Sequence, residues 1–225
     1  MPPIAKYIVL VHGAFVDGSS WRAVYDALTV DGYHVAVVQI PTLSLHDDAE
    51  VVRRAIDAQE GPVVLVGHSY GGAVITEAGN SDSVTALVYI AAFAPDAGES
   101  VKALGGDPSI EGSPIVEAPG GVFFQNRQTF HASFGADLSP ADAAFLADSQ
   151  VPWGVNAMTG SVGVPAWLDK PSWYLIATDD RMISPPAQRA MAQRAGATTV
   201  EVTASHAVYM SRPDAVAAVI RQACD

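Results

Sequence analysis

A serine stands between two glycines in the segment Gly67-His68-Ser69-Tyr70-Gly71, which follows an apolar run at 62–66. On a sharp turn from a strand to a helix, a serine hydroxyl is exposed, and flanking glycines remove side chains that would collide there. The dipole of the helix then favours negative charge nearby. The pattern predicts Ser69 as a nucleophile; the alternative is a tight corner with no chemical role. The glycine spacing fits neither a phosphate-binding loop nor a dinucleotide-binding loop.

A histidine and two aspartates follow later apolar runs and supply the partners that a serine nucleophile needs. A serine hydroxyl is weak near neutral pH, so it requires a base, and that base requires a third group to orient it. His206 follows the last strand-like run, which places it at the same sheet edge as Ser69. Asp179 and Asp180 follow the preceding run, and only one of them can face His206. Asp96, after the fourth run, is a further alternative.

The segment His12-Gly13-Ala14-Phe15 follows the first strand-like run and is suited to stabilising negative charge. Acyl transfer places that charge on an oxygen, which pre-positioned N–H donors must meet. We predict an oxyanion hole from the backbone amides of Ala14 and Tyr70, and we expect His12 to be a structural hydrogen-bonding residue. No metal or other cofactor is expected, because four further histidines lack a metal-ligand spacing with carboxylates or cysteine: His34, His46, His68 and His131.

Short β-branched runs alternate with helical stretches, which is typical of a parallel sheet covered by helices. The fold class is therefore α/β. Six strands are predicted, at Tyr7–Val11, 34–39, 63–66, 86–90, 173–177 and 199–202. Helices are predicted at 21–29, 49–58, 70–79, 186–194 and from Pro213 onward, with Ser20 capping the first and Asp47 or Asp48 the second.

The alternation breaks between residues 95 and 170, where glycine, proline and serine become frequent and clear helical periodicity is confined to 140–147. A structureless loop of this length is improbable in a compact domain. We therefore interpret 1–94 and 171–225 as the core and 95–170 as a helical or irregular lid. Apolar side chains in and near the lid are predicted to line a substrate pocket: Phe15, Phe124, Phe130, Trp153 and Met158.

Composition narrows the classes of partner. The chain has 225 residues, of which 49% are hydrophobic, and a formal charge of −12, which disfavours nucleic acid and anionic membranes. It has neither an apolar stretch of about 18 residues nor a secretory signal pattern, so we expect a cytoplasmic protein. Cys224 stands alone, which excludes a disulfide framework, and is expected on an exposed tail. Nine acidic and three basic residues at 95–170 favour a neutral substrate over a dianion.

Taken together, these motifs resemble α/β hydrolases over essentially the whole chain, and most of all the branch with plant methylesterases, hydroxynitrile lyases and bacterial esterases. The resemblance implies a mostly parallel six-stranded sheet with helices on both faces and a lid insertion. It also favours Asp180 as the triad acid, because the family's acidic loop has an aliphatic residue three positions on, here Ile183. The residues that carry the resemblance are Val9-Leu10-Val11-His12-Gly13-Ala14, Trp21, Val66-Gly67-His68-Ser69-Tyr70-Gly71-Gly72, Asp180 and His206.

That branch splits esters or cyanohydrins without a cofactor, and two positions separate the activities. The lyases resemble one another in a lysine after the triad histidine and a threonine in the oxyanion loop, where this chain has Ala207 and Ala14. We therefore predict an esterase that acts on a small neutral carboxylic ester through an acyl-enzyme. A perhydrolase with the same triad, a lyase-like activity and a non-catalytic ligand receptor are the alternatives. The sequence leaves a homodimer open.

Overall fold

A parallel six-stranded sheet forms the centre of the computed structural model, which describes residues 5–105 and 114–225. The strand order is β2-β1-β3-β4-β8-β9, and every neighbouring pair is parallel. All six predicted strands are confirmed, with some ends moved by one or two residues. Their bounds are β1 Tyr7–Val11, β2 His34–Val38, β3 Val63–His68, β4 Val84–Ile90, β8 Ser172–Ala177 and β9 Thr198–Val202.

The sheet brings the carboxyl ends of β1 and β3 side by side, with Val11 paired to Gly67. The chain runs from β1 outward to β2 and then returns to β3 on the other side, so the direction of strand order reverses here. Ligands of open α/β sheets bind at such a reversal, beyond the carboxyl ends of the strands. Every residue of β3 is buried, which explains the continuous apolar run Val63–Val66 with which it begins.

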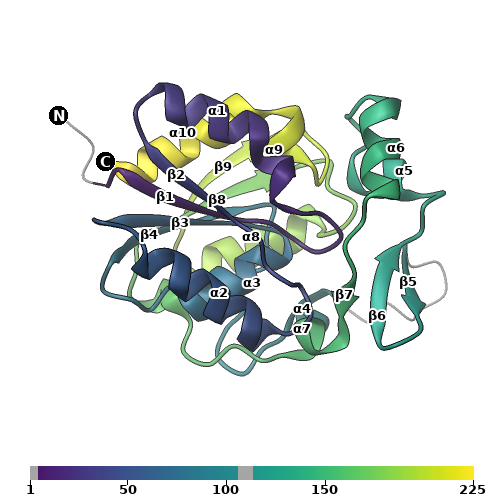
Figure 1. The fold of residues 1–225 in the computed structure, drawn as a ribbon, viewed down its shortest axis with the longest axis horizontal. Coiled ribbons are helices and arrows are strands. Elements are labelled where there is room, and N and C mark those ends of the chain that lie inside the picture. Colours follow the sequence, from purple (N-terminus) through teal and green to yellow (C-terminus); the bar gives the residue numbers. More distant parts are fainter. Residues whose placement is uncertain (1–4, 106–113) are drawn as a thin grey trace.

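Helices cover both faces of the sheet, as predicted (Figure 1). One face carries α1 (Arg22–Val30), α9 (Val208–Ser211) and α10 (Pro213–Cys224), and the other carries α2 (Leu45–Asp57), α3 (Tyr70–Ala78) and α8 (Pro185–Arg194). Cys224 is the last residue of α10 and is buried in the core rather than on an exposed tail, because it lies on the face of this helix that packs on the sheet. Its burial raises the pKa of the thiol to about 12. None of the described helices has the length and apolar character of a membrane span.

Two predicted helix starts are wrong. A 3-10 turn, η1 (Gly18–Trp21), precedes α1, and the carboxylate of Asp17 rather than Ser20 accepts the free amide of Ser19 at 2.8 Å. Helix α2 begins at Leu45, because the Ser44 hydroxyl accepts the amide of Asp47 at 3.4 Å. Serine and aspartate are both good caps, so neighbouring candidates compete. The pattern alone therefore leaves the first residue of a helix unsettled.

The segment 95–170, which we call the lid after the prediction above, contains an antiparallel sheet that the sequence pattern did not predict. Strands β5 (Ile115–Ala118), β6 (Val122–Gln125) and β7 (Trp153–Gly154) pair in that order. Each strand has four residues or fewer, too few for a clear alternating pattern. Around this sheet lie α4 Val101–Gly105, α5 Phe130–Phe134, α6 Pro140–Asp148, α7 Val155–Thr159 and η2 Ala166–Leu168. Helix α6 confirms the predicted helical stretch, whereas the part of the predicted lid at 106–113 lies outside the described residues.

Candidate active site

Ser69 lies on the turn between β3 and α3 with a left-handed backbone, φ 54° and ψ −123°. Such an angle in a residue other than glycine costs about 1–3 kcal/mol and is typical of functional sites. Two close approaches make the turn possible. A Cβ on Gly71 would lie 2.6 Å from the carbonyl oxygen of His12, and one on Gly13 would lie 2.7 Å from Cβ of Ser69. The glycines therefore let two loops meet around the serine.

His206 is held by Asp180, with 2.7 Å between Nδ1 and Oδ2. The same carboxylate accepts the backbone amides of Met182 at 2.7 Å and Ile183 at 2.9 Å. With Nδ1–H donated to Asp180, Nε2 of the neutral imidazole keeps a lone pair for a proton. Both side chains are buried, so the pair is shielded from water. Asp179, the neighbouring candidate, is exposed.

Gln188 is a member of this arrangement that no sequence signal marked. Its side-chain amide donates to Oδ2 of Asp180 at 2.8 Å and to the carbonyl of Ile183 at 2.7 Å, and its oxygen accepts the amide of Ala177 at 3.1 Å. It is fully buried on α8. Its side chain therefore ties the acidic loop to the end of β8 and orients the carboxylate. A glutamine in a helix has no periodicity or spacing that would reveal this position.

Ala14 and Tyr70, whose backbone amides are the predicted oxyanion donors, line the same cavity as Ser69. Among the described residues, neither amide donates a hydrogen bond to another protein group, so both remain free for a substrate oxygen. His12 has the structural contacts expected of it: one ring nitrogen contacts the carbonyl of Gly13 at 2.8 Å and the other accepts the amide of Ile40 at 3.1 Å. Burial lowers the pKa of His12, which favours the neutral ring.

His68, next to the serine, packs against His206 with 4.7 Å between ring centroids. Its Nε2 lies 2.9 Å from the carbonyl oxygen of His206. Burial is the main reason why the pKa of His68 lies well below its usual value, so the ring is neutral and Nε2–H donates to that carbonyl. Through this hydrogen bond, His68 holds the backbone of the loop that carries His206, which we call the histidine loop. Its role was not anticipated, because the two residues are 138 positions apart.

The lid also holds the histidine loop. The amide of Ala207 donates to the carbonyl of Phe134 at 3.0 Å, and the amide of Ser205 donates to Asp137 at 3.1 Å. The hydroxyl of Ser205 donates to the same carboxylate. Burial alone would raise the pKa of Asp137, but the hydrogen bonds it accepts outweigh burial and bring the pKa below its ordinary value. An ionised carboxylate of the lid thus secures the residue before His206.

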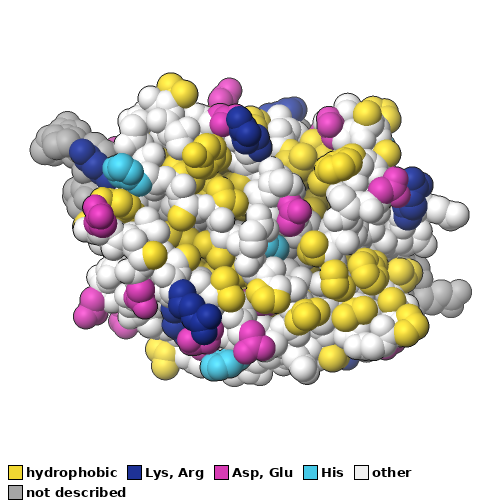
Figure 2. Space-filling model, viewed as in Figure 1, with side chains coloured by type: hydrophobic (Ala, Val, Ile, Leu, Met, Phe, Trp, Pro, Cys, Tyr) yellow, Lys and Arg dark blue, Asp and Glu magenta, His cyan; other side chains and the backbone are white. Residues whose placement is uncertain are grey.

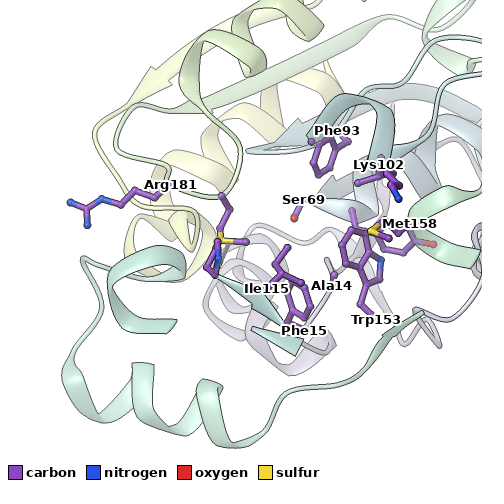
Figure 3. A pocket seen from close by; sticks show the side chains of 14 residues that line it. Ala14, Phe15, Ser69, Phe93, Lys102, Ile115, Trp153, Met158 and Arg181 are labelled. Atoms are coloured by element: carbon purple, nitrogen blue, oxygen red, sulfur yellow. The ribbon is translucent and has the colours of Figure 1, made fainter. Parts of the chain in front are cut away.

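A cavity of about 140 Å³ opens beside Ser69 between the core and the lid (Figure 3). Three of the predicted pocket residues line it: Phe15, Trp153 and Met158. Its other lining residues are Ala14, Ser69, Tyr70, Phe93, Val101, Lys102, Gly105, Pro114, Ile115, Arg181 and Met182. Phe15 adopts a left-handed φ of 68° and meets Trp153 edge to face, with 5.6 Å between ring centroids.

Two predicted pocket residues lie elsewhere, which corrects the prediction. Phe130 is fully buried in the lid's own cluster, where it stacks on Phe134 at 5.0 Å between ring centroids. Phe124 is half-buried on β6, and the alternation of a strand directs its neighbour Phe123 into the core instead. An aromatic residue of the lid can therefore pack either in the lid's own apolar cluster or in the cavity wall. Both surroundings are apolar, so the composition of the sequence does not show which one a given residue occupies.

Two cationic side chains also border the cavity, although the acidic composition of the lid did not suggest any. Lys102 extends from α4 near Met158, whereas the guanidinium of Arg181 points away from Ser69 (Figure 3). Arg181 donates to the carbonyl of Ala132 at 3.2 Å. Throughout residues 5–105 and 114–225, no three His, Cys, Asp or Glu side chains gather in a way that could hold a metal ion.

Residues 8–219 match the Alpha/beta hydrolase family, so the chain belongs to it. A pyrethroid hydrolase from Sphingobium wenxiniae is 29% identical, with 97% of this chain and 87% of that protein covered. The crystal structure of polyneuridine aldehyde esterase has a TM-score of 0.84 at 17% identity and covers 98% of this chain and all of that one. A methylesterase from Arabidopsis has a TM-score of 0.79 at 18% identity, with 97% and 98% covered. These likenesses confirm the predicted fold and family.

Proposed function

We propose that this chain is a carboxylic-ester hydrolase with Ser69 as nucleophile, His206 as base and Asp180 as the orienting acid. The observation that carries the proposal is the buried bond of 2.7 Å between His206 and Asp180 at the same sheet edge as a strained serine. Only one tautomer of the histidine satisfies that bond, and it leaves Nε2 unprotonated. The relatives named as hydrolases and esterases support the same class of reaction.

The proposed reaction has two halves. In the first, His206 takes the proton of Ser69 as the oxygen attacks the ester carbonyl, the amides of Ala14 and Tyr70 stabilise the oxyanion, and the alcohol leaves with the proton. In the second, His206 takes a proton from water as the water oxygen attacks the acyl-enzyme; the bond from the acyl carbon to Ser69 then breaks, the acid leaves, and His206 returns the proton to the Ser69 oxygen. Asp180 keeps the imidazole oriented and stabilises its charged form in both halves. No cofactor is required.

The cavity favours a small neutral ester. Its volume of about 140 Å³ accommodates a short acyl or alcohol group, and Phe15, Trp153 and Met158 provide apolar and aromatic contacts. A cyanohydrin substrate is less well served, because Ala207, the position of the lyases' lysine, is buried and its amide is bonded to the lid. Lys102 and Arg181 are the cationic residues in a lining that is otherwise mostly apolar.

Covalent labelling tests the proposed nucleophile directly. A fluorophosphonate probe should label the wild type and leave Ser69→Ala unlabelled, while circular dichroism confirms that both are folded. The same variant, and His206→Ala, should lose at least ~10³ in kcat toward p-nitrophenyl acetate, as expected when one member of a triad is removed. Equal labelling of wild type and Ser69→Ala would refute the proposal. Bromination of monochlorodimedone with acetate and peroxide separates a perhydrolase from an esterase.

A further inference from the structure

A buried carboxylate outside the proposed triad lies where the nucleophile turn meets the lid. Asp48, in the first turn of α2, has no exposed surface. Its Oδ1 accepts the amide of Thr42 at 2.8 Å, and its Oδ2 accepts the hydroxyl of Tyr70 at 2.6 Å. No cationic side chain of the described residues forms an ion pair with it. Burying such a group without a positive partner is costly, so its presence calls for an explanation.

Asp48 connects to the reaction through Tyr70. That residue follows the nucleophile directly, and its amide is one of the two proposed oxyanion donors. Its side chain extends from the start of α3 to Asp48 on α2. Its ring packs edge to face on Trp153, with 5.8 Å between ring centroids. The peptide group that carries this amide is held at one end by the carbonyl oxygen of Ser69, which accepts the amides of Gly72 and Phe93 at 3.0 Å each. No earlier helical turn holds it from the Tyr70 end, where the bond from the side chain to Asp48 supplies the further restraint.

Asp48 connects to the lid through Thr42. That residue has a left-handed φ of 59°, and its backbone oxygen accepts the amide of Gly154 at 2.8 Å. Its hydroxyl donates to the carbonyl of Pro152 at 2.6 Å. These two hydrogen bonds hold the residues on either side of Trp153, whose ring is the aromatic wall of the cavity. The carboxylate of Asp48 is therefore bonded both to Tyr70, which carries the proposed backbone donor, and to Thr42, which holds the strand that carries Trp153.

We propose that Asp48 is a positioning residue for ester hydrolysis: it sets the Tyr70 amide and the Trp153 wall relative to each other. This inference rests on the proposed function. The carboxylate lines no part of the cavity, so it acts through its two donors. Oxyanion donors contribute because they are placed before the reaction begins, and small displacements of reacting groups can reduce the rate by about 10².

Four variants separate positioning from folding. Asp48→Ala removes both acceptors. Asp48→Asn keeps the shape, because an amide oxygen can accept from Thr42 while the amide nitrogen donates to the oxygen of Tyr70. Tyr70→Phe removes one hydrogen bond and keeps the ring on Trp153. Asp47→Asn is the matched control, since Asp47 is the exposed carboxylate next in sequence.

The experiment measures kcat and KM for p-nitrophenyl acetate together with the unfolding midpoint of each variant. We expect kcat to fall about 10- to 100-fold in Asp48→Ala and about tenfold in Tyr70→Phe, with KM changed less than about threefold. Asp48→Asn should recover most of the rate, and Asp47→Asn should match the wild type. The double variant Asp48→Ala/Tyr70→Phe should be no slower than Asp48→Ala, because both remove the same link.

Wild-type kcat in folded Asp48→Ala and Tyr70→Phe would overturn the inference, as would losses that multiply in the double variant. If Asp48→Ala does not fold, Tyr70→Phe decides: a fall in kcat at constant KM supports positioning, and an unchanged kcat overturns it. Ser69→Ala keeps this test separate from the proposed function. Wild-type esterase activity in Ser69→Ala refutes the catalytic proposal, whereas an inactive Ser69→Ala beside a fully active Tyr70→Phe refutes only the role of Asp48.

Discussion

The strands of the sheet core and those of the lid differ in how deeply they are buried. Strands β1 and β3 lie among other strands and between two layers of helices, so their sequences are mostly apolar, with His68 at the end of β3 as the exception. Strands β5 and β6 belong to a small antiparallel sheet, in which β6 alternates between buried and half-buried positions and β5 has no buried residue. The core supplies the proposed catalytic groups, and the lid supplies much of the cavity wall. The proposed chemistry thus depends on the more constrained region, and we expect substrate selectivity to depend on the less constrained one.

Polar contacts join the two regions at several points. Asp137 of the lid holds the histidine loop, and Thr42 of the core holds the strand that carries Trp153. Arg194 of α8 forms a partly exposed ion pair with Glu99 at 2.7 Å. Figure 2 shows hydrophobic side chains scattered over one face, with charged groups between them. Specific hydrogen bonds and an ion pair therefore hold the lid against the core, in addition to the burial of apolar side chains.

Removing an aromatic side chain from the lid's own cluster is expected to have the largest effect on stability. Phe130→Ala should lower the free energy of unfolding by about 3–5 kcal/mol, because it leaves a cavity beside Phe134. It should leave KM for a small ester almost unchanged, whereas Trp153→Ala should alter KM. Urea unfolding and ester kinetics of both variants give the comparison. An altered KM in folded Phe130→Ala would mean that this side chain does reach the substrate.

The next effect compares a glycine of the core with one of the lid. A Cβ on Gly72 would lie 2.3 Å from the carbonyl oxygen of Phe93, and neither backbone can move freely. Gly72→Ala should therefore lower the free energy of unfolding by about 3 kcal/mol. Gly120 has a φ of +93° with open space around it, so Gly120→Ala should cost only about 1 kcal/mol. If urea unfolding gives similar losses of unfolding free energy for Gly72→Ala and Gly120→Ala, the core around Gly72 is less rigid than its contacts imply.

The smallest expected effect concerns the pH dependence of stability where core and lid meet. Burial raises the pKa of Asp48 from 3.8 to about 6, although hydrogen bonds from Tyr70 and Thr42 oppose the shift and nearby Asp47 adds to it. Between pH 4 and 6 the folded state then holds more protons than the unfolded state, so stability should fall as pH rises. The loss should be about 2–3 kcal/mol and should level off above pH 6.

Asp48→Asn removes this titration and supplies the test. Its free energy of unfolding, measured in urea at intervals from pH 4 to 8, should gain on that of the wild type up to about pH 6 and then run parallel to it. Asp47→Asn should follow the wild type throughout, because that carboxylate is exposed. A constant difference between Asp48→Asn and the wild type would show that Asp48 does not carry the raised pKa.

Strands and catalytic candidates were predictable because both depend on short, local patterns. An apolar run followed by a glycine turn identified β3 and Ser69, and similar runs placed Asp180 and His206 at the same edge. The choice between Asp179 and Asp180 relied on family resemblance, and the structure brings Asp180 to the histidine. Helix starts were less predictable, since Ser44 and Asp17 compete with adjacent polar residues as caps.

The sequence by itself determined the α/β class, the strands of the six-stranded sheet, the family and the residues proposed to perform acyl transfer, because buried strands and sharp turns require particular residue types nearby. Only the tertiary structure decided which aromatic residues face the cavity and that the lid contains a sheet. It also decided that Gln188 contacts Asp180, His68 the carbonyl of His206, and Asp48 the hydroxyl of Tyr70. Those contacts join residues far apart in the chain, and an apolar or polar side chain fits many surroundings equally well. Their partners are therefore chosen by packing, which no local pattern records.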